Sequence, residues 1–243
     1  MTADLPLENF PALAALPGIV HGFTGRIAGL DVKADRDVAL RRLDEFHAAA
    51  RAQLGLAARR FIIAEQVHGR EIAVVDEKTP VPVSGVDGLI TASPDVCLGI
   101  HVADCCAIFL ADPVRRVIAL LHSGRRGSEL GITAAAIGRM RAAFGCAPAD
   151  ITVQLSPCIR PPQYEIDFAA LIVAEARAAG ARQIFDSGTC TGANADRYYS
   201  YRVERGKTGR MLALLALSTG QPTRNGPALE TAGPAFSRES GSS

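Results

Sequence analysis

The stretch from residue 97 to residue 121 constrains the fold most, because short apolar runs follow one another with only brief polar breaks. Ala103 through Leu110 is nearly continuous apolar sequence, which is typical of a strand buried on both faces. Apolar runs of this kind predict strands, and we expect them at 18–24, 61–67, 71–76, 86–91, 97–103, 106–111, 117–121 and 151–155. The sequence therefore predicts a core built on a mixed β-sheet.

Longer amphipathic segments predict helices around this sheet. In 35–54, apolar residues from Leu40 to Leu54 repeat at helical spacing, and Gly55 follows them. A second helix is expected at 128–144, where Ser128 is a suitable N-cap and Gly145 a suitable terminator. Further helices are expected at 167–179 and, as a final apolar helix, at 209–217. We therefore expect an α/β fold with one domain over 1–217 and a polar, Gly/Pro/Ser-rich tail over 218–243.

The composition excludes several classes of protein. The chain has 243 residues with 26 basic and 25 acidic side chains, so no overall field favours nucleic acid or an anionic membrane. The N-terminus lacks the features of a signal peptide, and no apolar stretch is long enough to span a bilayer. A cytoplasmic protein is the expectation, with its six cysteines reduced.

Three residues at the polar ends of apolar runs form a candidate metal site: His68, Cys105 and His122. Zinc uses this set of Cys and His ligands, and three protein ligands leave one position open, as in catalytic zinc sites. Their spacing matches no zinc finger, so the fold would have to bring the ligands together. Each histidine alone is more typical of an ordinary hydrogen-bonded residue, but the set of three favours a metal site.

Polar neighbours of these residues suggest further roles. Asp104, inside an apolar run, needs a partner if it is buried, and we expect it to orient a ligand or to carry a proton. The segment from His122 to Gly127 predicts a strand–loop–helix junction with two arginines, a suitable phosphate site beside a metal. A solvated arginine pair on a turn explains the same segment equally well. Arg26 is a weaker candidate of the same kind.

Several motifs, in fixed order over residues 18–217, resemble those of the YfiH-like laccase-domain family. They are Gln66–Gly69, Asp87–Thr91, Ala103–Cys105 with Leu110–Pro113, His122–Gly127, Ser156–Ile159, Tyr164–Ile166, Cys190–Thr191, Ser200–Arg202 and Thr208–Arg210. The resemblance implies a single α/β domain of the YfiH and cytotoxic-necrotizing-factor type, with zinc on His68, Cys105 and His122. It also implies purine nucleoside phosphorylase activity with adenosine deaminase activity, whereas older labels call such proteins polyphenol oxidases.

The chain departs from the family pattern at positions near this site. The usual His-Ala-Gly-Trp-Arg-Gly is here His-Ser-Gly-Arg-Arg-Gly, and Ala107 replaces a usual proline. The stretches after Phe23 and after Ile166 look shortened. The metal ligands are retained, whereas the substrate contacts differ.

The residues alone leave other functions open. A laccase copper cluster needs many more imidazoles than the five histidines available, but a single copper in place of zinc on the same three ligands would still give weak polyphenol oxidase activity, which stays an alternative. Cys105 and His122 alternatively form a Cys–His hydrolase pair, and a binding protein with a vestigial site is a third interpretation.

We predict a zinc-dependent purine nucleoside phosphorylase that acts on inosine and adenosine, with adenosine deamination as a further activity. Its partners are a purine nucleoside and phosphate, and the oligomeric state is open. Asp104 and Arg126 are the predicted catalytic residues, and the residues predicted to bind substrate and phosphate are Arg26, Gln66 and Arg126.

Overall fold

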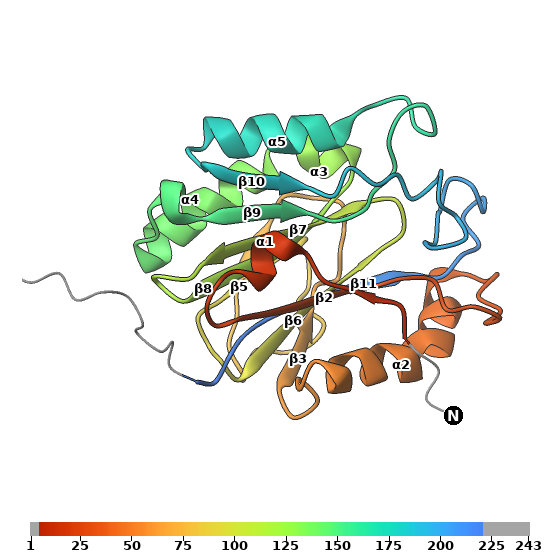
Figure 1. Cartoon of the computed structure of the whole chain (residues 1–243), viewed down its shortest axis with the longest axis horizontal. Helices are drawn as coiled ribbons and strands as arrows, with labels where there is room; N and C mark the ends of the chain where they lie inside the picture. The colour runs from red at the N-terminus through yellow and green to blue at the C-terminus, as the bar shows by residue number, and fades with distance from the viewer. Residues whose placement is uncertain (1–4, 221–243) are drawn as a thin grey trace, which may run out of the picture.

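The strands of the computed structural model, which describes residues 5–220, form two mixed sheets (Figure 1). The first sheet has the order β1-β2-β11-β6-β3 and the second the order β10-β9-β7-β8-β5-β4. The first sheet consists of β1 (Leu7–Glu8), β2 (Ile19–Thr24), β11 (Met211–Leu217), β6 (Val96–Val102) and β3 (Arg60–Ile63). The second consists of β10 (Gln183–Asp186), β9 (Thr152–Leu155), β7 (Cys106–Asp112), β8 (Val117–Ser123), β5 (Gly88–Thr91) and β4 (Ile72–Val74).

Helices cover the outer faces of the two sheets. In Figure 1, α3 (Arg125–Glu129), α4 (Ile132–Phe144) and α5 (Phe168–Ala178) lie on one side of the molecule, and α2 (Arg36–Gln53) lies on the opposite side. Two shorter elements, α1 (Pro11–Ala14) and the 3-10 helix η1 (Pro148–Asp150), complete the set. The α/β class predicted from the sequence is confirmed, with two mixed sheets where one was expected.

Three clusters of buried apolar side chains hold these layers together. The largest lies between the two sheets and includes Phe23, Leu98 and Phe109. A second packs α4 and α5 onto the six-stranded sheet, and a third packs the end of α2 onto the five-stranded sheet. The central strands therefore have both faces buried, as their unbroken apolar sequences predict.

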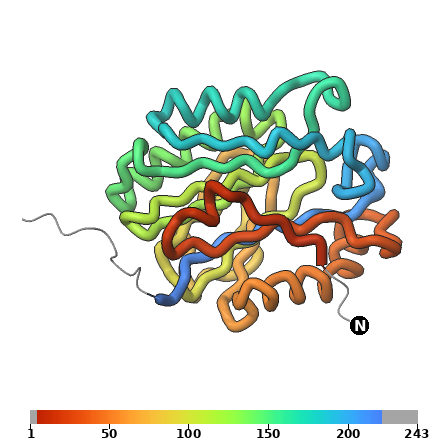
Figure 2. The backbone as a smooth tube through the Cα atoms, in the orientation of Figure 1, coloured from red at the N-terminus to blue at the C-terminus, as the bar shows by residue number. Residues whose placement is uncertain are grey.

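The predicted final helix at 209–217 is wrong, because this segment is strand β11. Leu212, Leu214 and Ala216 face the cluster beside α2, while the alternate residues from Met211 to Leu217 face the core between the sheets. With both faces buried, every position is apolar and the period of two that marks a strand is hidden. In Figure 2, β11 runs beside β2, with which it pairs in antiparallel fashion.

The other predicted elements agree with the structure except at one break. The helix expected at 128–144 is divided into α3 and α4, because Gly131 adopts a left-handed backbone with φ of +81°. Predicted helix 35–54 corresponds to α2 and 167–179 to α5, and each predicted strand overlaps an observed one. The elements β1, α1 and β10 were not predicted.

No helix in residues 5–220 combines the length and apolar character needed to cross a membrane. Most of the predicted tail, 221–243, lies outside the described residues. The single domain over 1–217 and the cytoplasmic location stay predictions. All six cysteines are free, and Cys97, Cys106 and Cys146 are buried among apolar side chains.

Candidate metal centre

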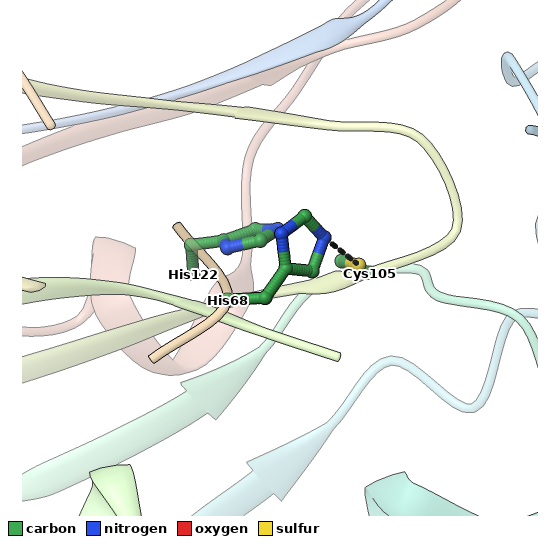
Figure 3. Close-up of side chains that lie close together, drawn as sticks. All are labelled: His68, Cys105 and His122. Atoms are coloured by element: carbon green, nitrogen blue, oxygen red, sulfur yellow. Dashed lines mark hydrogen bonds between the residues drawn. The ribbon is translucent and has the colours of Figure 1, made fainter. Parts of the chain in front are cut away.

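Three side chains from separate loops and strands meet at one point: His68, Cys105 and His122 (Figure 3). His68 lies in the loop between β3 and β4, Cys105 immediately precedes β7, and His122 belongs to β8, which pairs with β7. Their candidate ligand atoms all lie within 4.8 Å of one another, and Cys105 Sγ is 4.0 Å from His68 Nε2. The sheet therefore brings together the three ligands that the sequence predicts.

Asp87, at the start of β5, organises both histidines. Its carboxylate accepts hydrogen bonds from the backbone N–H groups of Val67, His68 and Gly69 at 2.7–3.2 Å. It also accepts one from His122 Nδ1 at 2.8 Å. Since a carboxylate only accepts, Nδ1 of His122 carries a proton, and Nε2 is the ring atom that would bind a metal, in place of its own proton.

The electrostatics of the cluster favour a thiolate. Burial opposes ionisation of Cys105, but the His122 charge and hydrogen bonds from both histidines outweigh it and lower the thiol pKa to about 6. Burial likewise opposes protonation of His122, but Cys105 and Asp87 raise its pKa to about 9. A thiolate beside imidazoles is a ligand set suited to zinc.

The backbone is unusual at the candidate ligands. Gln66, His68 and Asp104 have φ values of +66°, +59° and +78°, in the left-handed region that non-glycine residues rarely adopt. Each such conformation costs on the order of 1–3 kcal/mol and persists only where its surroundings enforce it. The three hydrogen bonds to Asp87 enforce it at His68, so this part of the fold maintains strain at the site.

Gly124 provides the space that Cys105 occupies. A Cβ placed on Gly124 would lie 2.7 Å from Cys105 Sγ, closer than any ordinary contact. The φ of Gly124 is −99°, which any residue adopts, so close packing rather than backbone conformation requires glycine here.

Asp104 is buried and its carboxylate is fully engaged. It accepts hydrogen bonds from the Thr191 hydroxyl at 2.7 Å, the Ser200 hydroxyl at 3.1 Å and the Arg202 backbone N–H at 2.7 Å. These bonds tie the turn that contains Cys105 to the segment around residues 191–202. The contact with a ligand histidine expected of Asp104 is made by Asp87.

The cluster opens into a pocket of about 1360 Å³. This volume exceeds the several hundred cubic ångströms typical of small-molecule sites. The candidate ligands, Gln66, Asp104 and Arg126 all line it. Arg125, which stands where the family pattern has tryptophan, also lines it and forms an ion pair with Glu129 at 2.8 Å.

Two of the other predicted residues have different surroundings from those expected. The side-chain amide of Gln66 forms two hydrogen bonds with the backbone of His101. Its Nε2 donates to the carbonyl at 2.6 Å, and its Oε1 accepts from the N–H at 3.0 Å. Arg26 pairs with Glu204 at 2.6 Å, donates to the Tyr198 carbonyl and is outside the residues that line the pocket.

Sequence reasoning missed Asp87, Arg36 and Arg210 as site residues. Asp87 had a signal, because it is an acid at the start of an apolar run in one of the quoted motifs. Arg36 and Arg210 line the pocket from α2 and from the start of β11, and the incorrect helix at 209–217 concealed Arg210.

Two mixed sheets with a Cys/His cluster at their edge define an α/β protein with a candidate catalytic metal site. The chain belongs to the family described as multi-copper polyphenol oxidoreductase laccase, whose model matches residues 24–171 and 163–218. The family expected from the motifs is thereby confirmed.

Relatives of the chain have a second kind of name. The purine nucleoside phosphorylase of Deinococcus radiodurans is 34% identical over 261 residues, covering 93% of this chain and 97% of its own. The purine nucleoside phosphorylase YlmD of Geobacillus stearothermophilus is 32% identical over 258 residues, covering 84% of this chain and 91% of its own.

The crystal structure of YlmD superposes with a TM-score of 0.76 at 25% identity, over 90% of this chain and 98% of that one. That of YfiH from Bacillus licheniformis shares the fold, with a TM-score of 0.74 at 22% identity over 88% and 99%. The names of these relatives support an enzyme of the phosphorylase kind.

Proposed function

We propose that this protein is a zinc-dependent purine nucleoside phosphorylase that acts on inosine and adenosine. The observation that supports this most is the convergence of His68, Cys105 and His122 on a wide pocket that Arg126 also lines. The names of the relatives point to the same reaction.

The donor set fits zinc. One thiolate and two imidazole nitrogens would supply three of the four ligands that zinc takes, and one position would be left for water or substrate. Copper binds the same donors, so the resident metal is to be measured on protein as purified. When bound, the metal supplies a Lewis acid at the polar end of the pocket.

The other residues prepare the reaction around this centre. Arg126 forms no ion pair in residues 5–220, and its guanidinium is available to hold the attacking phosphate. Asp87 fixes the two histidines, and Asp104 holds the turn that presents Cys105. Gln66 fixes the pocket wall at His101. A phosphate on Arg126 would share the pocket with the nucleoside, and the reaction requires that one of its oxygens reach C1′.

The decisive experiment is chromatography of inosine and adenosine after incubation with zinc-loaded protein, with and without phosphate. Phosphate-dependent release of hypoxanthine from inosine is expected, and Cys105→Ser should abolish it. Cys190→Ser is the matched control, because Cys190 is a partly exposed free thiol outside the cluster. Inosine formed from adenosine would demonstrate deamination. No base release from protein that contains one zinc would refute the proposal.

One observation favours a second function, a Cys–His hydrolase. The low pKa of Cys105 beside His122 is what an attacking thiolate requires. The two functions respond oppositely to a chelator, because zinc removal abolishes the phosphorylase and frees the thiolate of the hydrolase.

A further inference from the structure

The pocket contains more unpaired arginines than phosphorolysis of an uncharged nucleoside needs. Among the arginines that line it, four form no ion pair with a carboxylate in the described residues, and they are Arg36, Arg126, Arg205 and Arg210. Of the acidic residues that line it, Glu129 pairs with Arg125, Asp35 pairs with Lys207, and Asp104 accepts three hydrogen bonds. Only Asp37 among them has no such partner in residues 5–220. The donors to Asp104 are uncharged, so the four guanidinium groups less the carboxylates of Asp37 and Asp104 leave a net charge of +2, carried by arginines of several elements.

The unpaired arginines approach from two sides. Arg126 belongs to α3, which lies with the helices beside the six-stranded sheet. Arg36 opens α2, which Figure 1 shows on the opposite side of the molecule. Arg210 immediately precedes β11, and its carbonyl lies 3.2 Å from Nε2 of His47 in α2. Arg36 and Arg210 therefore form one wall and Arg126 another.

Arg210 is the most telling of these residues, because it is buried to 9% exposure without a carboxylate. One nitrogen of its guanidinium donates to the carbonyls of Thr208 and Gly209 at 2.8 Å, which orients the group, and Asp104 and Cys105 offset its charge only in part, because burial and Arg36 still lower its pKa. A buried charge is costly unless an opposite charge accompanies it. The first turn of α2 also lines the pocket, and its free backbone N–H groups are positive, although Asp37 in the same turn offsets part of this potential.

We propose that Arg36 and Arg210 bind the 5′-phosphate of a purine nucleoside 5′-monophosphate, while Arg126 holds inorganic phosphate at the opposite wall. This inference rests on the proposed phosphorolysis and extends its substrate from an uncharged nucleoside to a nucleotide. The pocket, at about 1360 Å³, has room for both.

The reaction balances without any further reactant. An oxygen of hydrogen phosphate bonds to C1′ as the bond from C1′ to N9 breaks, and the purine keeps the electron pair. The proton of the phosphate ends on the purine, and the sugar leaves as ribose 1,5-bisphosphate.

The test compares inosine with inosine 5′-monophosphate by calorimetric titration of the zinc-loaded protein in phosphate-free buffer. The monophosphate should bind at least about tenfold more tightly, the effect of roughly one charge-assisted hydrogen bond. Arg36→Ala, at an exposed position, should remove most of this advantage, and Arg210→Gln should do the same. Arg41→Ala is the matched control, because Arg41 is exposed on the same helix but does not line the pocket.

Equal affinity for the two ligands would overturn the proposal, as would an advantage that survives in Arg36→Ala. Turnover separates this result from the function itself. Inosine phosphorolysis without tighter binding of the monophosphate would refute the second phosphate site and leave the phosphorylase intact. Tighter binding that depends on Arg36 and Arg210, without release of base from either ligand, would support the site and refute the phosphorylase.

Discussion

Substitution of Gly124 by alanine tests the geometry of the candidate metal centre without removing any ligand. The new Cβ would lie 2.7 Å from Cys105 Sγ, whereas ordinary contacts begin at 3.4 Å. The sulfur must therefore shift by roughly 0.7 Å to reach an ordinary contact, and by about 0.8–1.3 Å to reach the 3.5–4.0 Å optimum for such atoms. Ligand distances in metal sites are defined to about 0.2 Å, so this displacement disrupts the coordination.

We expect Gly124→Ala to weaken zinc binding by at least about 10- to 100-fold, the range found when groups that orient ligands are lost. The assay is competition against a chromophoric zinc chelator, with purified apoprotein. Gly138→Ala is the control, because no atom lies within 4 Å of a Cβ at Gly138. The control should bind zinc like the parent and be more stable by up to about 1 kcal/mol, since Gly138 is inside α4.

Zinc affinity of Gly124→Ala within two- or threefold of the parent would refute this reasoning. It would mean either that Cys105 is not a ligand or that the turn before β7 adjusts freely. The second explanation is testable in the same variant, because free adjustment requires loss of the hydrogen bonds that tie Asp104 to Thr191, Ser200 and Arg202. Hydrogen exchange of the Arg202 amide reports on that loss.

Three further predictions follow from single contacts. Asp87→Asn should weaken zinc binding by about 10–100-fold, because an amide is a poorer acceptor for the His122 ring and the 67–69 backbone. The control Asp76→Asn, at an exposed turn, should leave zinc binding unchanged. Stability should fall as the pH drops from about 6.5 to 4, because burial lowers the pKa of His21 to about 4 while the unfolded chain takes up that proton near 6.5. The loss from this residue is about 3 kcal/mol at pH 4, measurable by urea denaturation, and an unchanged slope in His21→Gln would contradict it. Gly99→Ala should destabilise the protein by about 1–3 kcal/mol in the same assay, because its Cβ would lie 2.4 Å from the Phe61 ring. A urea midpoint equal to that of the parent protein would show instead that the ring moves freely.

Much of the fold could be predicted because buried strands have distinctive sequences. The runs that became β6, β7 and β8 are almost entirely apolar, and their polar ends placed Cys105 and His122 at the same end of the paired strands β7 and β8. The failure at β11 has the same physical origin. A seven-residue run that is buried on both faces has no period, and in Met211–Leu217 no β-branched residue distinguishes a strand from a helix. The division into two sheets depends on pairing between β2 and β11, which are distant in sequence.

The sequence indicated the three candidate ligands of the site, but not the residues that hold them in position. His68, Cys105 and His122 were identified by residue type and position, whereas Asp87 was missed because its partners depend on the crossing of a loop over β5. Arg26 shows the opposite error, because it was predicted to bind phosphate from its residue type alone. Its guanidinium is already balanced by Glu204, a partner 178 residues away that no local pattern identifies.

Laccase and phosphorylase, the two activities named for the family and for its members, require different numbers of histidine ligands. A cluster of several coppers needs many imidazoles in one place, whereas only one group of three metal-binding side chains exists in residues 5–220. His21 accepts a hydrogen bond from the Phe10 N–H, and His47 and His101 are buried against each other with pKa values lowered by burial. Two imidazoles and one thiolate remain, a set that holds one ion. The charge around this candidate site, where four arginines that line the pocket form no ion pair in residues 5–220, suits the proposed binding of phosphate.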